Sequence, residues 1–252
     1  MKGFAVIACD IKISRGKNQV LDIEQFRLKT GEVMALLGVN GSGKSTLVQA
    51  LALLLKTDSG KVFILGEEVT PKKELSLRRK MAVVFQEPLL LDTTVYKNVA
   101  SGLLLRGFQS ADIDRRVREW LAHLGIESLA SRQARFLSGG ESQRVSLARA
   151  FAVEPEVLFM DEPFSALDYP TKRTLITELS DILKTTRIAT VLVTHDPSEI
   201  PLIARSVTVL HRGKIAQYGD LKEIQTRPAN ETVAALVGVI NHKLARDSRL
   251  VN

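Results

Sequence analysis

The stretch that decides the fold is Gly38-Val39-Asn40-Gly41-Ser42-Gly43-Lys44-Ser45. It follows a short apolar run at 33–37 that is typical of a buried strand, and it precedes a helical pattern at 46–55. Between a strand and a helix, such glycines let backbone N–H groups point inward around phosphates, and the helix N-terminus favours an anion. The loop therefore predicts a nucleotide phosphate site. A glycine-rich turn that binds nothing is the alternative, and the two flanks argue against it.

Individual side chains of this loop have expected roles. Lys44 should contact the β- and γ-phosphates, and the Ser45 hydroxyl should be a ligand of Mg²⁺. The expected nucleotide contacts are Gly38, Asn40, Gly41, Ser42, Gly43, Lys44, Ser45 and Thr46.

Around the loop, apolar runs alternate with longer helical patterns. Further strands are predicted at 81–85, 157–160 and 190–194, with a helix at 170–183. This alternation predicts an α/β fold, with a parallel sheet covered by helices on both faces. The mostly helical stretch at about 89–153 interrupts the alternation, and we interpret it as a subdomain inserted between two core strands. Strand-like runs at 4–8 and 61–65 indicate an additional antiparallel sheet beside the core.

Two acids follow the predicted strand 157–160. At the carboxyl end of a parallel strand, Asp161 and Glu162 would face the crevice where ligands bind. Asp161 is expected to hold Mg²⁺ through water, and Glu162 to polarise the attacking water as general base. A pair of solvated acids is the alternative, which the nearby phosphate loop disfavours.

Two further polar residues follow predicted strands. Gln86 comes directly after 81–85, where it could reach the metal or the attacking water, although a Gln after a strand is commonplace. His195 comes directly after 190–194. A lone His is more often structural, but here it ends a third strand aimed at one pocket, so we expect a γ-phosphate contact.

A second glycine-containing stretch is Leu137-Ser138-Gly139-Gly140-Glu141. It precedes a helical pattern at 142–153, with Ser138 near the helix cap. A capped helix start explains Ser138 and Glu141 but not two successive glycines, so we expect a second anion site. Two anion sites with one set of metal ligands indicate a nucleotide shared between two chains.

Composition excludes several classes. The proportions of 45% hydrophobic and 25% charged residues in 252 residues are those of an ordinary globular protein. The apolar run at 50–55 is far shorter than the roughly 20 residues that span a bilayer. The apolar stretch before Cys9 is also shorter than the roughly 7–15 residues of a secretory signal, so an opening strand is expected there.

Charge and cysteine usage add little more. Cys9 is the only cysteine, which excludes an internal disulfide and fits a reducing cytoplasm. A net charge of +7 would suit nucleic acid or anionic headgroups. Aromatic residues make up only 5% and are not interleaved with arginines, so no nucleic acid partner is expected.

Together, these residues resemble the nucleotide-binding subunit of an ABC (ATP-binding cassette) transporter over residues 1–228. In the family's terms, the motifs are Walker A at 38–46, the Q-loop at Gln86, the signature at 137–141, Walker B at 157–161 with the catalytic Glu162, the D-loop at 165–168 and the H-loop at His195. The resemblance implies a P-loop NTPase with a RecA-like core, an inserted α-helical subdomain and an N-terminal antiparallel β subdomain. A short extension at 229–252 would follow the ATPase domain.

The resemblance also implies a mechanism. Two subunits pack head to tail, so each ATP lies between one subunit's Walker motifs and the other's Ser138, Gly139 and Gly140, with Asp168 of the D-loop nearby. ATP binding closes the dimer, and hydrolysis opens it. Implied partners are a second copy or a second ATPase subunit, integral membrane permease subunits and an extracytoplasmic substrate-binding protein. The chain would act at the cytoplasmic face of the cell membrane.

Arg15 departs from the family pattern. An aromatic residue usually stacks on adenine in this segment, and the alignment of Gly16 with Val20-Leu21 places Arg15 at that position. A planar guanidinium can stack on a purine, so we expect Arg15 to contact the base.

Other ABC functions remain open at this point. Repair and chromosome ATPases carry long coiled coils within the cassette, whereas Gln86 and Leu137 lie close in the sequence, and translation factors usually carry two cassettes. The segment 93–99 resembles an importer pattern, with an exporter or lipoprotein-release ATPase as the alternative. The stretch 228–234, with Val237, Gly238 and Asn241, resembles the lead-in to a regulatory domain in sugar and tungstate or molybdate importers. It suggests an oxyanion cargo such as tungstate or molybdate, with a simple docking helix as the alternative.

Overall fold

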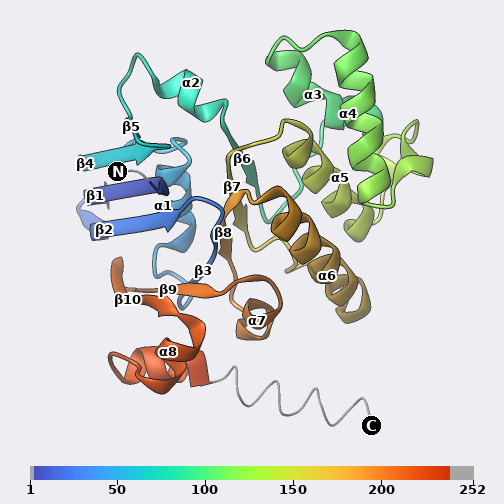
Figure 1. The fold of residues 1–252 in the computed structure, drawn as a ribbon. Helices are drawn as coiled ribbons and strands as arrows, with labels where there is room; N and C mark the ends of the chain where they lie inside the picture. Colours follow the sequence, from blue (N-terminus) through green and yellow to red (C-terminus); the bar gives the residue numbers. More distant parts are fainter. Residues whose placement is uncertain (1–2, 239–252) are drawn as a thin grey trace, which may run out of the picture.

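The computed structural model describes residues 3–238, which form two sheets flanked by helices (Figure 1). The larger sheet has the order β10-β9-β3-β8-β7-β6, and all neighbouring strands are parallel except the antiparallel β9–β10 pair. Its strands are β3 Val33–Leu37, β6 Met81–Val84, β7 Val157–Asp161, β8 Ala189–Val193, β9 Ser206–His211 and β10 Lys214–Asp220. The predicted parallel α/β core is confirmed.

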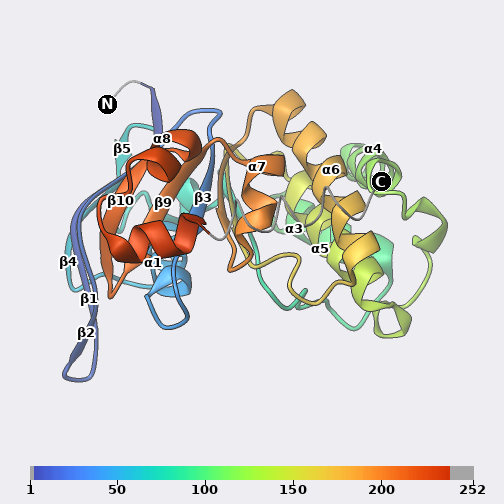
Figure 2. The ribbon, with the colours of Figure 1, turned by 90° about the horizontal axis from the view of Figure 1, so that it is seen from below.

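The smaller sheet is antiparallel, with the order β2-β1-β4-β5. Its strands are β1 Phe4–Arg15, β2 Asn18–Lys29, β4 Ser59–Ile64 and β5 Glu67–Glu68. The predicted N-terminal antiparallel subdomain is confirmed, but β1 is longer than the predicted run at 4–8. Figure 2 shows this sheet at one end of the molecule and the helical subdomain at the other.

The helical subdomain contains α3 Val95–Leu105, α4 Ser110–His123 and α5 Gly139–Ala152, with short 3-10 turns at Glu127–Leu129 and Ala134–Phe136. The mostly helical stretch expected at about 89–153 is divided where Gly107 and Gly125 adopt φ of 78° and 64°. Left-handed backbone ends a helix, and glycine adopts it without steric cost. The insertion between β6 and β7 is confirmed, with three helices in place of one long pattern.

Helix α1 spans Lys44–Leu51, earlier than the pattern at 46–55 predicted. Gly43 has a φ of 102°, so the chain turns into the helix directly after it. Leu53 has a φ of 59°, which is incompatible with a continued helix. The early start places both Lys44 and Ser45 in the first helical turn.

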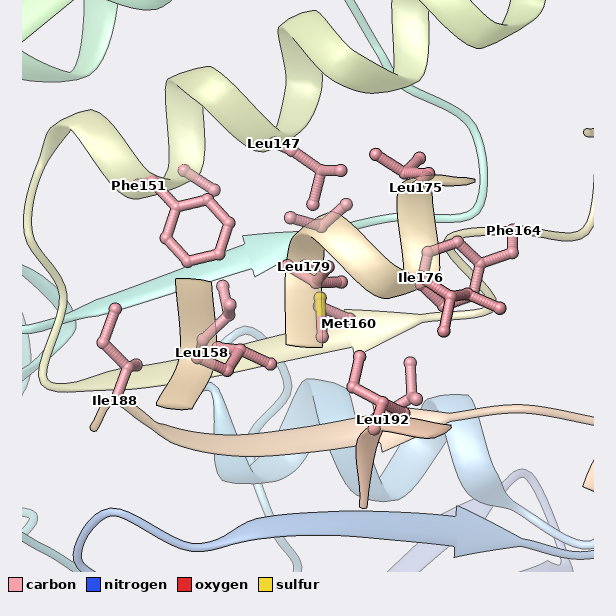
Figure 3. Close-up of a cluster of buried hydrophobic side chains, with 14 of the residues drawn as sticks. Leu147, Phe151, Leu158, Met160, Phe164, Leu175, Ile176, Leu179, Ile188 and Leu192 are labelled. Atoms are coloured by element: carbon pink, nitrogen blue, oxygen red, sulfur yellow. The ribbon is translucent and has the colours of Figure 1, made fainter. Parts of the chain in front are cut away.

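The main core lies between the larger sheet and two helices. Figure 3 shows Leu147 and Phe151 of α5 together with Leu175 and Leu179 of α6 (Tyr169–Thr186), packed over Leu158 and Met160 of β7 and Leu192 of β8; all of these are buried. Each such side chain contributes about 2 kcal/mol when fully buried. This packing fixes α5 and α6 against β7 and β8, the strands that end at the candidate site.

The remaining helices are short: α2 Glu74–Arg78, α7 Ile200–Ile203 after a 3-10 turn at Pro197–Glu199, and α8 Leu221–Thr226. Residues 231–238 are also helical, and Val233 and Val237 are buried in the main core. The domain boundary at 228 stays a prediction, and Asn241 lies outside the described residues. Among residues 3–238, no helix combines the length and apolar character needed to span a bilayer.

Candidate nucleotide site

The phosphate loop, residues 38–45, connects β3 to α1 and is closely packed from two sides. A Cβ atom on Gly43 would lie 2.6 Å from Cδ2 of Leu21 in β2, and one on Gly38 would lie 2.4 Å from the carbonyl oxygen of Leu210 in β9. Gly43 also has a left-handed φ of 102°. The neighbouring strands therefore fix the path of the loop, and side chains are excluded at these two positions.

Lys44 extends back along the loop. Its ammonium donates to the carbonyl oxygens of Gly38 at 2.9 Å and Val39 at 3.2 Å, and the residue is only 6% exposed. Burial lowers the pKa of Lys44, and the nearby carboxylates of Glu162 and Asp161 oppose that shift. The loop thus holds a cation in a partly desolvated position.

Ser42 provides a test of whether the loop fits a phosphate. Its hydroxyl is buried and has no hydrogen-bond partner among the described residues. An unsatisfied buried polar group costs about 1–3 kcal/mol, a penalty that a phosphate oxygen can relieve. The orphaned hydroxyl and the buried Lys44 ammonium both fit an anionic ligand in the loop.

Ser45 and Asp161 come together at the carboxyl ends of β3 and β7. The Ser45 side chain hydrogen bonds to Asp161, while burial raises the pKa of Asp161 and the neighbouring Glu162 raises it further. A hydroxyl and a carboxylate are oxygen ligands of the kind Mg²⁺ accepts, so this pair fits the predicted metal. A cation here would also offset the cost of burying the ionised Asp161 carboxylate.

Gln86 lies at the same edge of the sheet, two residues after the end of β6. Strand β6 ends at Val84, which is opposite Met160 of β7, and the Gln86 side chain is exposed. Among residues 3–238, no group of three His, Cys, Asp or Glu side chains is arranged to hold a metal. The predicted set contains only one carboxylate, so its remaining ligands would be Ser45, Gln86 and water.

Glu162 and His195, which were predicted separately, are in direct contact. Oε2 of Glu162 lies 2.9 Å from Nδ1 of His195, and the Glu162 N–H donates to the Val193 carbonyl oxygen at 3.0 Å. Glu162 has a φ of 48°, a strained conformation for a residue with a side chain. The neighbouring strands β7 and β8 hold this strained turn and aim both side chains toward one point.

The signature stretch, residues 137–141, forms the start of α5. Ser138 and Glu141 form a reciprocal capping box: the Ser138 N–H donates to Glu141 Oε2 at 2.7 Å, and the Glu141 N–H donates to Ser138 Oγ at 3.3 Å. The helix therefore begins at Gly139, three residues before the predicted start. Ser138 and Gly139 remain exposed.

The two signature glycines have different surroundings. A Cβ on Gly140 would lie 3.1 Å from Cγ2 of Thr171, whereas one on Gly139 would meet nothing within 4 Å. Close packing against α6 thus explains why residue 140 is a glycine, and the sequence did not reveal this packing. For Gly139, residues 3–238 offer no such neighbour.

Arg15 lies in a hairpin and Asp168 at the start of α6. Arg15 is exposed at the tip of the β1–β2 hairpin, opposite Asn18, and the hairpin packs against the phosphate loop through Leu21. Asp168 caps α6 by accepting from Thr171 N at 3.0 Å and Thr171 Oγ1 at 2.8 Å. The backbone hydrogen bond from Thr171 lowers the pKa of Asp168. This carboxylate is thus engaged by its own helix.

Gly213, in the β9–β10 turn, was not identified from the sequence. Its N–H donates to the Ser42 carbonyl oxygen at 3.0 Å, and its carbonyl accepts from the Asp22 N–H at 2.8 Å. A Cβ at this position would lie 2.3 Å from the Val20 carbonyl oxygen. Gly213 therefore joins the phosphate loop to β2, and the Arg212-Gly213 turn after the apolar run 206–210 was the available signal.

Comparisons with known proteins identify the family of this chain. The family model described as ABC transporter matches residues 21–165. The chain is 38% identical to the sulfate/thiosulfate import ATP-binding protein CysA of Mesostigma viride, covering 98% of this chain and 71% of that protein. It is 41% identical to the protein of the same name from Nocardia farcinica, covering 88% of this chain and 67% of the relative.

A solved structure agrees at the level of the fold. CbiO1 from Clostridium perfringens, part of the ABC transporter complex CbiONQ, superposes with a TM-score of 0.80 at 28% identity, covering 90% of this chain and 96% of that one. The family match spans more than half of the chain and includes the phosphate loop, the signature stretch and the Asp161-Glu162 pair. The chain therefore belongs to the ABC transporter ATP-binding family and is an ABC ATPase.

Proposed function

We propose that this chain is the ATP-hydrolysing subunit of an ABC importer and works as a head-to-tail dimer on two ATP molecules. The observation that carries the proposal is the convergence of three strand ends on one edge of the larger sheet. There, the phosphate loop follows β3, the Ser45–Asp161 pair joins α1 to β7, and the Glu162–His195 contact joins β7 to β8. This arrangement combines phosphate binding, a metal ligand pair and a candidate base.

In this proposal each residue has a defined task. The loop glycines and Lys44 hold the ATP phosphates, and Arg15 stacks on the base. Ser45 and Asp161, with Gln86, hold Mg²⁺, which when bound offsets negative charge on the phosphate oxygens. Glu162 accepts the proton of the attacking water, and His195 orients the Glu162 carboxylate and contacts the γ-phosphate.

The exposed signature stretch completes the site of a second copy. Ser138 Oγ, Gly139 and the first N–H groups of α5 form a helix N-terminus at which Ser138 and Gly139 are exposed. Such a terminus favours a phosphate through its unpaired N–H groups and dipole. In the closed dimer, Asp168 lies next to this shared nucleotide.

The proposed cargo is an oxyanion, in the sulfate or thiosulfate class. The relatives named above carry import names for these anions, and they give no support to tungstate or molybdate. The chain would work with integral membrane permease subunits at the cytoplasmic face of the membrane, together with an extracytoplasmic binding protein. Uptake of labelled sulfate, thiosulfate and molybdate by the reconstituted complex separates these cargoes, and a molybdate-only result would overturn this part.

Glu162→Gln tests the catalytic assignment. The amide cannot accept the proton of water, so ATP turnover should fall by about 100-fold or more while ATP binding persists. Glu24→Gln, at an exposed position of β2, is the matched control and should behave as the native chain does. A Glu162→Gln protein that hydrolyses ATP at the native rate would rule out Glu162 as the base.

A further inference from the structure

A buried charge cluster lies next to His195 and contains no predicted site residue. Its cation is Lys172 of α6, whose ammonium contacts Asp196 Oδ2 at 3.0 Å and also pairs with Glu199. The three side chains are 18%, 19% and 5% exposed, respectively. The cluster therefore joins the first turns of α6 to the segment after β8, and α7 follows this segment beside α6 (Figure 2).

The segment 194–199 is held by its own hydrogen bonds as well. Thr194 Oγ1 donates to Glu199 Oε2 at 2.6 Å and accepts from the Asp196 N–H at 2.9 Å. His195 lies between Thr194 and Asp196 in the sequence, so these hydrogen bonds fix its backbone on both sides. Its side chain is 55% exposed and relies on this backbone for its direction.

Two chain segments thus meet at three points. The Glu162 N–H donates to Val193 O at 3.0 Å, and the Glu162 carboxylate contacts His195 at 2.9 Å. Lys172 pairs with the two carboxylates that follow His195 in the segment 194–199. Lys172 follows Glu162 by ten positions along the same segment. The segment 162–172 is therefore joined to the segment 193–199 twice, by the Glu162–His195 contact and by the ion pairs of Lys172.

We infer that Lys172 is a positioning residue for hydrolysis, which holds the segment 194–199 so that His195 meets the Glu162 carboxylate. This inference rests on the proposed function, because it assigns Lys172 to the Glu162–His195 site. Within residues 3–238, Lys172 forms ion pairs with Asp196 and Glu199 and none with Glu162. Its effect passes through Asp196 and Glu199.

The charge of Lys172, and not only the packing of its side chain, holds the segment 194–199 in position. Burial by itself lowers the pKa of Lys172, but hydrogen bonds to Glu199 and Asp196 outweigh it and raise the pKa, so the ammonium stays charged. Without this cation, two carboxylates would remain close together in a partly desolvated place, and they repel each other there. The segment 194–199, which carries both carboxylates and begins with Thr194 and His195, would have to move.

Lys172→Met removes the charge and keeps the aliphatic stem. Because a misplacement of about 1 Å at a catalytic group costs up to about 100-fold, we expect the kcat of ATP hydrolysis to fall at least about tenfold. KM for ATP should stay within about twofold, because Lys44 and the phosphate loop are untouched. Lys172→Arg should restore most of the kcat, because a guanidinium can pair with both carboxylates.

Lys184→Met is the matched control. Lys184 lies on the same helix and pairs with Asp181 at 3.0 Å, but both side chains are 70% exposed. It should leave kcat unchanged. If Lys172→Met does not fold, as measured by thermal unfolding, Glu199→Gln serves instead, since it preserves shape and hydrogen bonding while removing one charge of the cluster.

The outcomes separate the two proposals. An unchanged kcat in folded Lys172→Met, an equal loss in Lys184→Met, or a loss that Lys172→Arg does not restore would overturn the positioning role. A KM change without a kcat change would overturn it as well. Normal turnover in Glu162→Gln would instead overturn the proposed function itself.

Discussion

The phosphate loop and the signature stretch both place glycines at the start of a helix, but they are completed in different ways. The phosphate loop is enclosed by β2 and β9, with Lys44 and Ser42 buried and the Ser42 hydroxyl left without a partner among the described residues. The signature stretch satisfies its own side chains in a capping box and leaves Ser138 and Gly139 exposed. The first is a site that needs a ligand, whereas the second is a stable surface that another molecule can use.

Removing the Lys44 ammonium should have the largest effect on this comparison. Lys44→Met takes a cation from the enclosed loop, so ATP turnover should fall by about 1,000-fold, at the upper end of what a single preorganised charge contributes. Nucleotide affinity should fall with it. Lys12→Met, at an exposed strand position, should leave both unchanged. Native ATP affinity and turnover in Lys44→Met would show that the loop does not hold the phosphates.

Gly139→Asp should separate the stability of the signature stretch from its function. A carboxylate in the first turn of α5 favours the helix dipole, and a Cβ here meets nothing within 4 Å, so the melting temperature should stay the same or rise. The same carboxylate would oppose a phosphate of the second copy, which should reduce ATP turnover by about 100-fold. Thermal unfolding and steady-state hydrolysis measure the two effects.

Mixing variants tests whether the two regions meet across chains. A dimer of one Lys44→Met chain and one Gly139→Asp chain retains one composite site with both halves intact. The mixture should therefore recover up to about one quarter of native turnover, since half of the dimers are mixed and each contains one such site. If no activity returns and both single variants still dimerise, the two halves do not come from different chains.

Much of the enclosed site could be predicted because its residues follow buried strands directly. β3 matches its predicted bounds, and the polar residues after β7 and β8 meet because these strands are neighbours, with Asp161 opposite Val193. β2 was missed because two successive exposed residues, Glu24 and Gln25, interrupt the alternation of apolar and polar residues that indicates a strand. Strand β9 was missed although β-branched Val207, Thr208 and Val209 follow one another in it.

Contacts between distant elements could not be predicted from the sequence. The close approach of Thr171 to Gly140 depends on how α6 packs against α5, and the Lys172 cluster depends on where α6 passes the end of β8. Neither follows from local spacing, since the partners are more than twenty positions apart in the sequence. Local patterns therefore predicted which residues line the enclosed site but not what supports them.

Arg15→Tyr should have a smaller effect, because the hairpin tip is exposed and contributes only stacking. A cation–π contact at an exposed site is worth about 0.5–1 kcal/mol, so the ratio of ATP to GTP turnover should change by a few-fold. Lys17→Tyr, at the same hairpin tip, is the control for adding an aromatic ring nearby. If neither the preference nor the affinity changes, Arg15 does not contact the base.

Asp161→Asn should have only a small effect on the stability of the folded chain, and the sign of this effect distinguishes the two regions. Burial raises the pKa of Asp161 above the ordinary value of 3.8, so the folded state holds this proton more tightly than the unfolded chain does. For a carboxyl group shifted in this direction, the contribution to stability is greatest at low pH and is lost as the pH rises through the folded pKa. The nucleotide-free Asp161→Asn protein should therefore gain melting temperature over the native chain as the pH rises from about 4 to 8, while ATP turnover is lost. The Asn side chain can still accept from Ser45, so that hydrogen bond is kept.

Ser138→Ala, in the signature stretch, should instead lower the melting temperature at every pH in this range, because losing a helix cap costs about 1 kcal/mol. If the difference in melting temperature between Asp161→Asn and the native chain is the same at every pH, ionisation of the Asp161 carboxyl group does not lower the stability of the fold. The phosphate loop and the signature stretch would then differ only in exposure.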